Sequence, residues 1–228
     1  MSVIAEHLAT VRHRIAAACG RCGRDPRTVE LVAVSKTRPA EDVREAFRAG
    51  QRIFGENYVQ ELVAKAADLH EPVEWHVIGH LQSNKVRQIA GLTSLIHSVD
   101  RLSLARELSR QWGRLEKVCN LLVQVNVSGE ASKSGTTAAE ALALVREIAR
   151  LPHLRVQGLM TMPPFFDDPE EARPYFRELR LLADRIREEA IPGVAMERLS
   201  MGMSGDFEVA VEEGATLVRV GTAIFGER

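Results

Sequence analysis

Lys36 is the residue whose type and position most directly suggest chemistry. It follows the apolar run Leu31–Ser35 and precedes a turn that reaches Pro39. If that run is a buried strand, the lysine side chain emerges at the strand end, partly removed from water. Desolvation lowers the pKa of a lysine, and a neutral amine can form a Schiff base with an aldehyde. The position alone also fits an ordinary solvated lysine, and that alternative stays open.

Two segments rich in glycine and hydroxyl residues form a second cluster near the C-terminus. They are Ser200–Asp206 and Val220–Gly226, and each follows an apolar run. Barrels commonly bind phosphate after their last two strands, through backbone N–H groups and hydroxyls. The candidate groups here are Gly202, Gly205, Gly221, Ser200, Ser204 and Thr222. The segments match neither the Walker nor the Rossmann glycine pattern, and Ser204 is alternatively the N-cap of the next helix.

Arg219 precedes Gly221 by two residues, so the two share one face of a strand. If that face points inward at the mouth of a barrel, the guanidinium can donate a hydrogen bond to a ligand. Because a buried unpaired charge is costly, the alternative is an ion pair with a carboxylate such as Glu56 or Glu197.

Polar or small residues follow several other apolar runs. They are Asn57, His80 with Gln82, Asn126 and Met160.

Two further patterns give only a weak indication of a site. Cys19 and Cys22 form a single C-x-x-C at the end of the first expected helix, not after a strand, so metal or redox use is not expected. His76 and His80 share a strand face, but no third ligand is evident, so a zinc site is not expected either.

The elements that must position these residues alternate along the chain. Eight apolar runs predict strands at 31–35, 52–55, 74–79, 95–99, 120–127, 155–161, 197–201 and 216–221. Amphipathic patterns predict helices at 4–18, 39–50, 56–69, 83–90, 101–114, 137–150, 169–189 and 205–213. This alternation predicts a single (β/α)8 TIM barrel with an extra N-terminal helix, as one domain over 1–228. An open doubly wound sheet is the structural alternative. The loop 162–169, with its prolines and acidic pair, is expected on the strand-end face.

Composition narrows the class of protein. A formal net charge of −1 and the absence of a basic block argue against binding to nucleic acid. No uninterrupted apolar stretch reaches the length of a membrane span. Charged residues interrupt the N-terminal segment, so a signal peptide is not expected. Three cysteines, an odd number, argue for a reducing compartment. We therefore expect a cytoplasmic protein that does not associate with membranes.

The chain also resembles the YggS/PROSC-type family of pyridoxal phosphate homeostasis proteins, whose barrel is similar to that of alanine racemase. The matching stretches run in order over nearly the whole chain. They are LVAVSKTRP, FGENYVQE, WHVIGHLQSNK, VNVSGEASKSG, GLMTMPP and SMGMSGDFEVAVEEGATLVRVGTAIFG.

The resemblance implies pyridoxal 5′-phosphate (PLP) as the cofactor and a role for individual residues. Lys36 would be the Schiff-base residue, and Asn57 would lie beside the cofactor ring. Arg219 would face the pyridine nitrogen. The phosphate would be held by Ser200, Gly221 and Thr222. Cys19 and Cys22 are not part of the family pattern.

The expected role is that of a reservoir or carrier that releases PLP to apo-enzymes, not that of an enzyme. A racemase of this fold needs an acid/base group on each face of the bound amino acid. The two tyrosines, Tyr58 and Tyr175, do not fall on predicted strand ends, and no second domain is expected. A charged donor at the ring nitrogen also makes the ring a poor electron sink. The alternatives are a PLP-dependent racemase or, less favoured, a Schiff-base aldolase. A monomer is expected.

Overall fold

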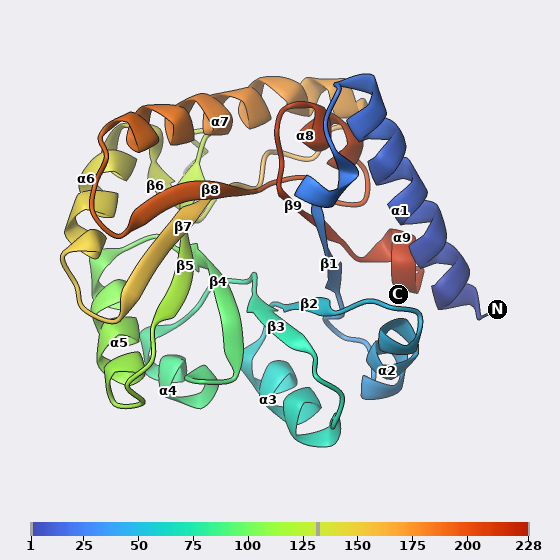
Figure 1. Cartoon of the computed structure of the whole chain (residues 1–228), viewed down its shortest axis with the longest axis horizontal. Helices are drawn as coiled ribbons and strands as arrows, with labels where there is room; N and C mark the ends of the chain where they lie inside the picture. Colours follow the sequence, from blue (N-terminus) through green and yellow to red (C-terminus); the bar gives the residue numbers. More distant parts are fainter. Residues whose placement is uncertain (1, 131–132, 228) are drawn as a thin grey trace.

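The computed structural model describes residues 2–130 and 133–227. Eight parallel strands form a closed barrel in the hydrogen-bonded order β4-β3-β2-β1-β9-β8-β7-β5, and a β4–β5 pairing closes the ring (Figure 1). The strands are β1 (Glu30–Val34), β2 (Ile53–Glu56), β3 (Glu74–Val77), β4 (Thr93–Val99), β5 (Cys119–Asn126), β7 (Leu154–Met160), β8 (Val194–Ser200) and β9 (Leu217–Val220). A two-residue strand, β6 (Thr136–Thr137), pairs with the end of β5. The predicted barrel is confirmed, and the open sheet is excluded.

Helices surround the barrel, as Figure 1 shows. The long ones are α1 (Val3–Arg21), α2 (Ala40–Arg48), α3 (Val59–Asp68), α5 (Leu102–Gly113), α6 (Ala138–Ala149) and α7 (Arg173–Glu188). The short ones are α4 (Val86–Ile89), α8 (Phe207–Glu212), α9 (Thr222–Phe225) and the 3-10 turns η1 (Pro26–Thr28), η2 (Ser83–Lys85) and η3 (Pro169–Ala172). The extra N-terminal helix is confirmed, and α1 packs against α2, α8 and α9.

Local sequence signals set several helix boundaries. The Ser2 side chain accepts a hydrogen bond from the Ala5 N–H at the start of α1. The Thr137 hydroxyl caps the start of α6, where it accepts a hydrogen bond from the Glu140 N–H at 3.2 Å and donates to the Glu140 carboxylate at 2.8 Å. Two expected helices differ from their predictions. The one at 83–90 is divided into η2 and α4, and the one at 169–189 begins as η3.

Side chains of the strands alternate between two apolar cores. A small core inside the barrel consists of Val32, Ile78, Leu95, Leu122, Met160 and Leu217. A larger core fills the space between the strands and the helices. On β1, Val32 is therefore inward and Ala33 outward, and continuing the two-residue period past the strand end makes Ser35 outward and Lys36 inward. The same period on β2 makes Glu56 outward and Asn57 inward.

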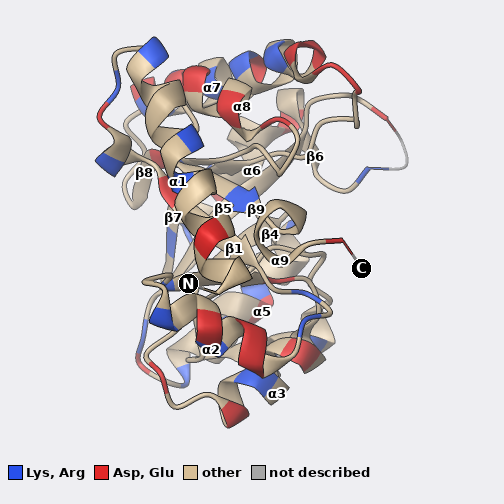
Figure 2. Ribbon diagram, turned by 90° about the vertical axis from the view of Figure 1, so that its right-hand side faces the viewer, with Lys and Arg blue, Asp and Glu red and all other residues tan. Residues whose placement is uncertain are grey.

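Charges on the outside of the molecule are mixed. Figure 2 shows acidic and basic residues interspersed along α2, α3 and α7. Within 2–130 and 133–227, no helix combines the length and the apolar character that crossing a bilayer requires.

Close packing of β7 against β8 gives the first prediction. A Cβ added at Gly158 would lie 1.8 Å from the Arg198 carbonyl oxygen, so Gly158→Ala must push the two strands apart. Gly20→Ala is the matched control, because it lies in α1 with nothing within 4 Å of the added atom. We expect Gly158→Ala to lower the free energy of unfolding by about 3 kcal/mol or more, and Gly20→Ala to raise it by about 0.5–1 kcal/mol. Urea unfolding measures both, and equal effects would contradict the packing described here.

Candidate functional site

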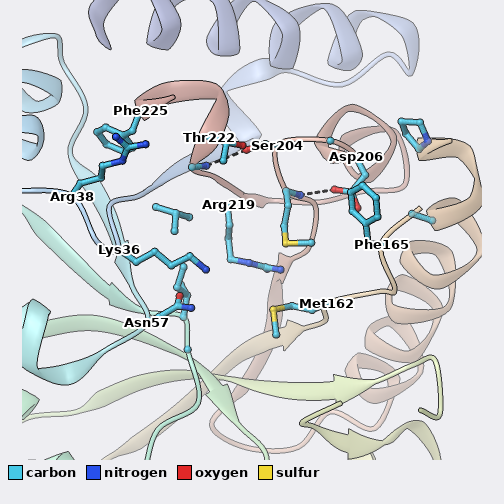
Figure 3. A pocket seen from close by; sticks show the side chains of 18 of the residues that line it. Lys36, Arg38, Asn57, Met162, Phe165, Ser204, Asp206, Arg219, Thr222 and Phe225 are labelled. Atoms are coloured by element: carbon cyan, nitrogen blue, oxygen red, sulfur yellow. Dashed lines mark hydrogen bonds between the residues drawn. The ribbon is translucent and has the colours of Figure 1, made fainter. Parts of the chain in front are cut away.

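A cavity of about 460 Å³ lies at the carboxyl ends of the strands, as expected for a barrel of this kind. Residues from both ends of the sequence line it, among them Lys36, Asn57, Ser204, Arg219 and Thr222. In Figure 3, Lys36 and Asn57 lie side by side at one end of the cavity, and Arg219 extends between Lys36 and Met162. Five of the six residues predicted from the sequence, all but Ser200, therefore line one cavity, since Gly221 is also part of its wall.

Lys36 lies in a tight turn that begins one residue after β1. The Arg38 N–H donates to the Ser35 carbonyl oxygen at 3.0 Å, which closes the turn over Lys36 and Thr37. Thr37 has a φ of +63°, in the left-handed region. This region is uncommon for a β-branched residue, so the surrounding structure must support the turn. Lys36 itself is partly buried, so the expected removal from water is confirmed.

Hydroxyl and backbone N–H groups meet at the top of the cavity in Figure 3. The Ser204 oxygen accepts hydrogen bonds from the Gly221 N–H at 3.2 Å and the Ala223 N–H at 3.5 Å. Thr222 begins α9 beside them. Helix α8 is capped at Asp206, so the alternative role of Ser204 as its N-cap is wrong. The cluster joins the loops after β8 and β9 and presents donors suited to an anion.

Ser200 does not lie with this cluster. Its side chain is fully buried, and it is not among the residues that line the cavity. Ser200 pairs with Leu217, the first residue of β9, four residues before Gly221. At about 3.3 Å per residue, that places it roughly 13 Å below Gly221 along the strand. The structure thus separates Ser200 from the phosphate-suited groups with which the sequence had placed it.

Arg219 is a buried cation whose hydrogen-bond partners are neutral. Its guanidinium donates to the Ser200 hydroxyl at 2.5 Å and to the Thr161 carbonyl at 2.9 Å. Burial lowers the pKa of Arg219 to about 10, with the Asp206 carboxylate opposing this, so the side chain stays charged at neutral pH. The alternative ion pair with Glu56 is not formed, because Glu56 pairs with Lys65 on the outer side of β2. A buried cation without a bonded carboxylate favours an anionic or electron-rich ligand in the cavity.

A chain of hydrogen bonds fixes the far side of Arg219. Ser200 Oγ lies 2.8 Å from His97 Nδ1, and His97 Nε2 lies 2.9 Å from His76 Nδ1. In a neutral histidine one ring nitrogen donates and the other accepts, so His97 bonds Ser200 on one side and His76 on the other in a single continuous chain. Burial lowers the pKa of His76 to about 3 and that of His97 well below its usual range, so both rings are neutral. The chain therefore orients Arg219 without neutralising it.

Asn57 reaches the cavity because a glycine faces it. A Cβ at Gly79 would lie 2.5 Å from the Asn57 carbonyl oxygen and 2.7 Å from its Cα. Only glycine permits the loop after β3 to approach the segment after β2 this closely. The position of Asn57 thus depends on the loop after β3.

The remaining predicted strand-end residues have different positions. His80 lines the cavity, and Met160 lies in the apolar core inside the barrel. Asn126 instead donates to the Glu130 carbonyl at 2.9 Å and shapes the loop after β5. From the loop 162–169, the side chains of Met162, Phe165 and Phe166 form one wall of the cavity (Figure 3).

The two tyrosines lie outside the cavity lining. Tyr58 is 57% exposed and is the N-cap residue of α3, two residues after the end of β2. Tyr175 stacks on Phe166 with ring centroids 5.7 Å apart.

The cavity wall also contains Asp206 and His80, two titratable groups that the sequence analysis did not consider as acids or bases. Burial raises the pKa of Asp206, while its bond from the Met203 N–H opposes this.

The C-x-x-C pattern of the sequence lies at the end of α1 and not after a strand. Cys19 is buried, Cys22 is exposed, and both are free thiols. Cys22 donates to the Ala18 carbonyl at 3.3 Å, a local contact at the end of α1. No group of three or more metal-ligating side chains occurs within 2–130 and 133–227.

This chain is similar to known proteins over nearly its whole length. The family model "Alanine racemase, N-terminal domain" matches residues 7–228. A curated relative from Pseudomonas aeruginosa, named pyridoxal phosphate homeostasis protein, is 49% identical and aligns over 100% of this chain and 97% of its own length. The structure of PipY from Synechococcus elongatus with PLP bound is 39% identical, with a TM-score of 0.86 over 98% of this chain and 100% of that chain.

A more distant structure shows the fold alone. Alanine racemase from Corynebacterium glutamicum is 18% identical with a TM-score of 0.73, and the match covers 99% of this chain but 61% of that chain. The full-length match to the curated relatives is what defines the family. This chain belongs to the pyridoxal phosphate homeostasis protein family and has the barrel fold of the alanine racemase N-terminal domain.

Proposed function

We propose that this protein binds PLP in the 460 Å³ cavity, through a covalent link to Lys36, and that it acts as a carrier of PLP. The observation that supports this most strongly is the set of groups in one cavity. An amine, a buried cation and an anion-suited cluster lie on separate parts of its wall. The PLP-bound structure of the relative PipY supports the same ligand.

The residues present fit the cofactor. PLP supplies an aldehyde that condenses reversibly with amines, with loss of one water and formation of a C=N bond. Ser204, Thr222 and the N–H of Gly221 would hold its phosphate, which replaces the sequence-based choice of Ser200. Lys36 would present its amine to the aldehyde, and Asn57 would contact the ring beside it. The cavity volume lies within the range of about 300–1,000 Å³ that is common for small-molecule sites.

Arg219 would face the ring nitrogen. Its charge persists at neutral pH, and its position is fixed by Ser200 and by the Thr161 carbonyl. A permanently charged donor at this nitrogen keeps it unprotonated, which limits the ring as an electron sink. This favours holding the cofactor over carbanion chemistry.

The carrier role rests on these electrostatics and on the lack of a tyrosine among the cavity residues. Apo-enzymes that use PLP, or free amines, would be the acceptors. A cytoplasmic location, a monomeric state and the absence of a nucleic-acid partner remain predictions.

The second candidate function is an amino-acid racemase. Such an enzyme needs a second acid or base that faces Lys36, and His80 and Asp206 in the cavity wall favour it for that reason.

The covalent link gives a direct test. After loading with PLP and reduction with borohydride, we expect the phosphopyridoxyl group on the peptide that contains Lys36. Lys36→Ala should lose this label and the visible absorbance of the bound cofactor. Lys117→Ala is the control, because Lys117 is an exposed lysine in the loop before β5. A label on another lysine, or a colourless loaded protein, would refute the proposal.

The phosphate assignment is tested by comparing PLP with pyridoxal, which lacks the phosphate. Hydrogen bonds to a charged group contribute about 1.5–3 kcal/mol. We therefore expect Ser204→Ala to reduce the affinity ratio of PLP to pyridoxal roughly tenfold or more. Ser200→Ala should leave that ratio unchanged within about twofold, because Ser200 lies below the cavity. The reverse ranking, measured by equilibrium dialysis, would restore the assignment of Ser200.

The carrier and racemase roles predict different results with the loaded protein. We expect an apo-enzyme to gain activity faster from the loaded protein than from the same amount of free PLP. We also expect D-amino acids to appear no faster than with free PLP when a panel of L-amino acids is supplied. Racemisation above that rate, lost in Lys36→Ala, would show that the racemase role is correct.

A further inference from the structure

A buried ionic cluster lies directly behind the turn that carries Lys36. Lys65, on α3, places its amine 2.7 Å from Glu56 Oε1 and 2.6 Å from the Ser35 carbonyl oxygen. The Ser35 hydroxyl donates to the same Glu56 oxygen at 2.7 Å. Glu61, one turn before Lys65 on α3, lies 3.5 Å from the Lys65 amine.

The alternation of the strands explains why this cluster is next to the cavity without being part of it. Ser35 and Glu56 face outward toward α3, while their neighbours Lys36 and Asn57 line the cavity. Ser35 is thus the chain neighbour of Lys36, and Glu56 is the chain neighbour of Asn57. A displacement of Ser35 or Glu56 passes directly to that neighbour through the backbone.

Side chains of helix α3 bond the turn at two residues, Ser35 and Thr37. Lys65 bonds the Ser35 carbonyl, which also accepts the Arg38 N–H that closes the turn. The Thr37 N–H donates to Glu61 Oε2 at 2.7 Å. Thr37 is the residue with a φ of +63°, so Glu61 supports the backbone conformation that is least favourable on its own. Lys36 lies between these two anchored residues.

A buried ion pair is not the arrangement that would stabilise the fold most at this position. The Glu56 side chain is fully buried, and its second oxygen has no hydrogen-bond partner. Burial raises the pKa of Glu56, while the hydrogen bond from Lys65 opposes this. Well-packed apolar residues in place of a buried ion pair are often equally or more stabilising. The ionic cluster therefore contributes directed hydrogen bonds to the turn, which apolar residues would not supply.

We propose that Lys65 and Glu61 are positioning residues for Lys36. They fix the turn so that the lysine amine is held where the covalent link to the ligand aldehyde forms. The proposal rests on the proposed function, since it requires that Lys36 bind an aldehyde. Neither residue lines the cavity, so neither is expected to touch the ligand.

The experiment compares two ligands that differ at one group. PLP carries the aldehyde, whereas pyridoxine 5′-phosphate carries an alcohol there and cannot form the link. In Lys65→Met and in Glu61→Ala, we expect the dissociation constant of PLP to rise tenfold or more. The dissociation constant of pyridoxine 5′-phosphate should change less than twofold. Glu61→Ala is the milder variant, since the Glu61 side chain is 31% exposed, and it serves if Lys65→Met fails to fold.

A double-mutant cycle with Lys36→Ala separates positioning from a general structural role. In the Lys36→Ala background, Glu61→Ala should change PLP affinity less than twofold, because no link remains to be positioned. Arg146→Met is the control variant. It removes a surface ion pair with Glu189 that is outside the cavity, and it should affect neither ligand.

Three outcomes would overturn the proposal. The first is equal weakening of both ligands, which indicates a general role in the fold. The second is a full effect of Glu61→Ala in the Lys36→Ala background. The third is unchanged PLP affinity in both single variants while the unmutated protein still links PLP at Lys36. Failure of the unmutated protein to form that link is a different result, because it refutes the proposed function itself.

Discussion

The two-residue period of parallel strands is the constraint on which the rest of this site depends. In a closed barrel every second side chain points inward, and its neighbours point to the surrounding helices. The ends of β1 and β2 use both directions. Lys36 and Asn57 line the cavity, while Ser35 and Glu56 bond to Lys65 of α3. A binding group and its support are therefore adjacent in sequence and separated by the wall of the barrel.

The second constraint is the buried charge of Arg219. Its bonded partners inside the barrel are a hydroxyl and a carbonyl, and behind the hydroxyl lie two neutral histidines. A carboxylate in place of Ser200 would neutralise the guanidinium and reduce its attraction for a ligand. The chain of neutral partners fixes the orientation of Arg219 and leaves its charge directed at the cavity. This arrangement accounts for the deep burial of Ser200, His97 and His76, whose polar atoms would otherwise be costly there.

The sequence predicted the barrel well because most strands contain several apolar residues, as β1 does, and local signals such as Pro39 bound the helices. It also placed Lys36 and Thr222 at the cavity, because residues just after strands share one end of a barrel, and it placed Arg219 there because of its face on the last strand. Ser200 was misplaced because the stagger between β8 and β9 is a property of the closed ring, and no local pattern encodes it. The contacts of His97 and Lys65 were missed for a related reason. Apart from Glu61, which is one helical turn from Lys65, their partners are 9 to 103 residues away and meet them only in the folded chain.

A carrier must hold its ligand firmly and still release it, and the proposed contacts in this cavity would meet both needs. Phosphate and ring contacts would provide affinity that does not depend on chemistry at Lys36. The covalent link would add retention that water or another amine can reverse, without any change in the fold. Under the proposed positioning by α3, the groups that orient Lys36 lie outside the cavity lining, so a substitution there would change the link without altering the cavity wall. Phe165 and Met162, which line the cavity, are 84% and 38% exposed, so this wall of the cavity is open to solvent.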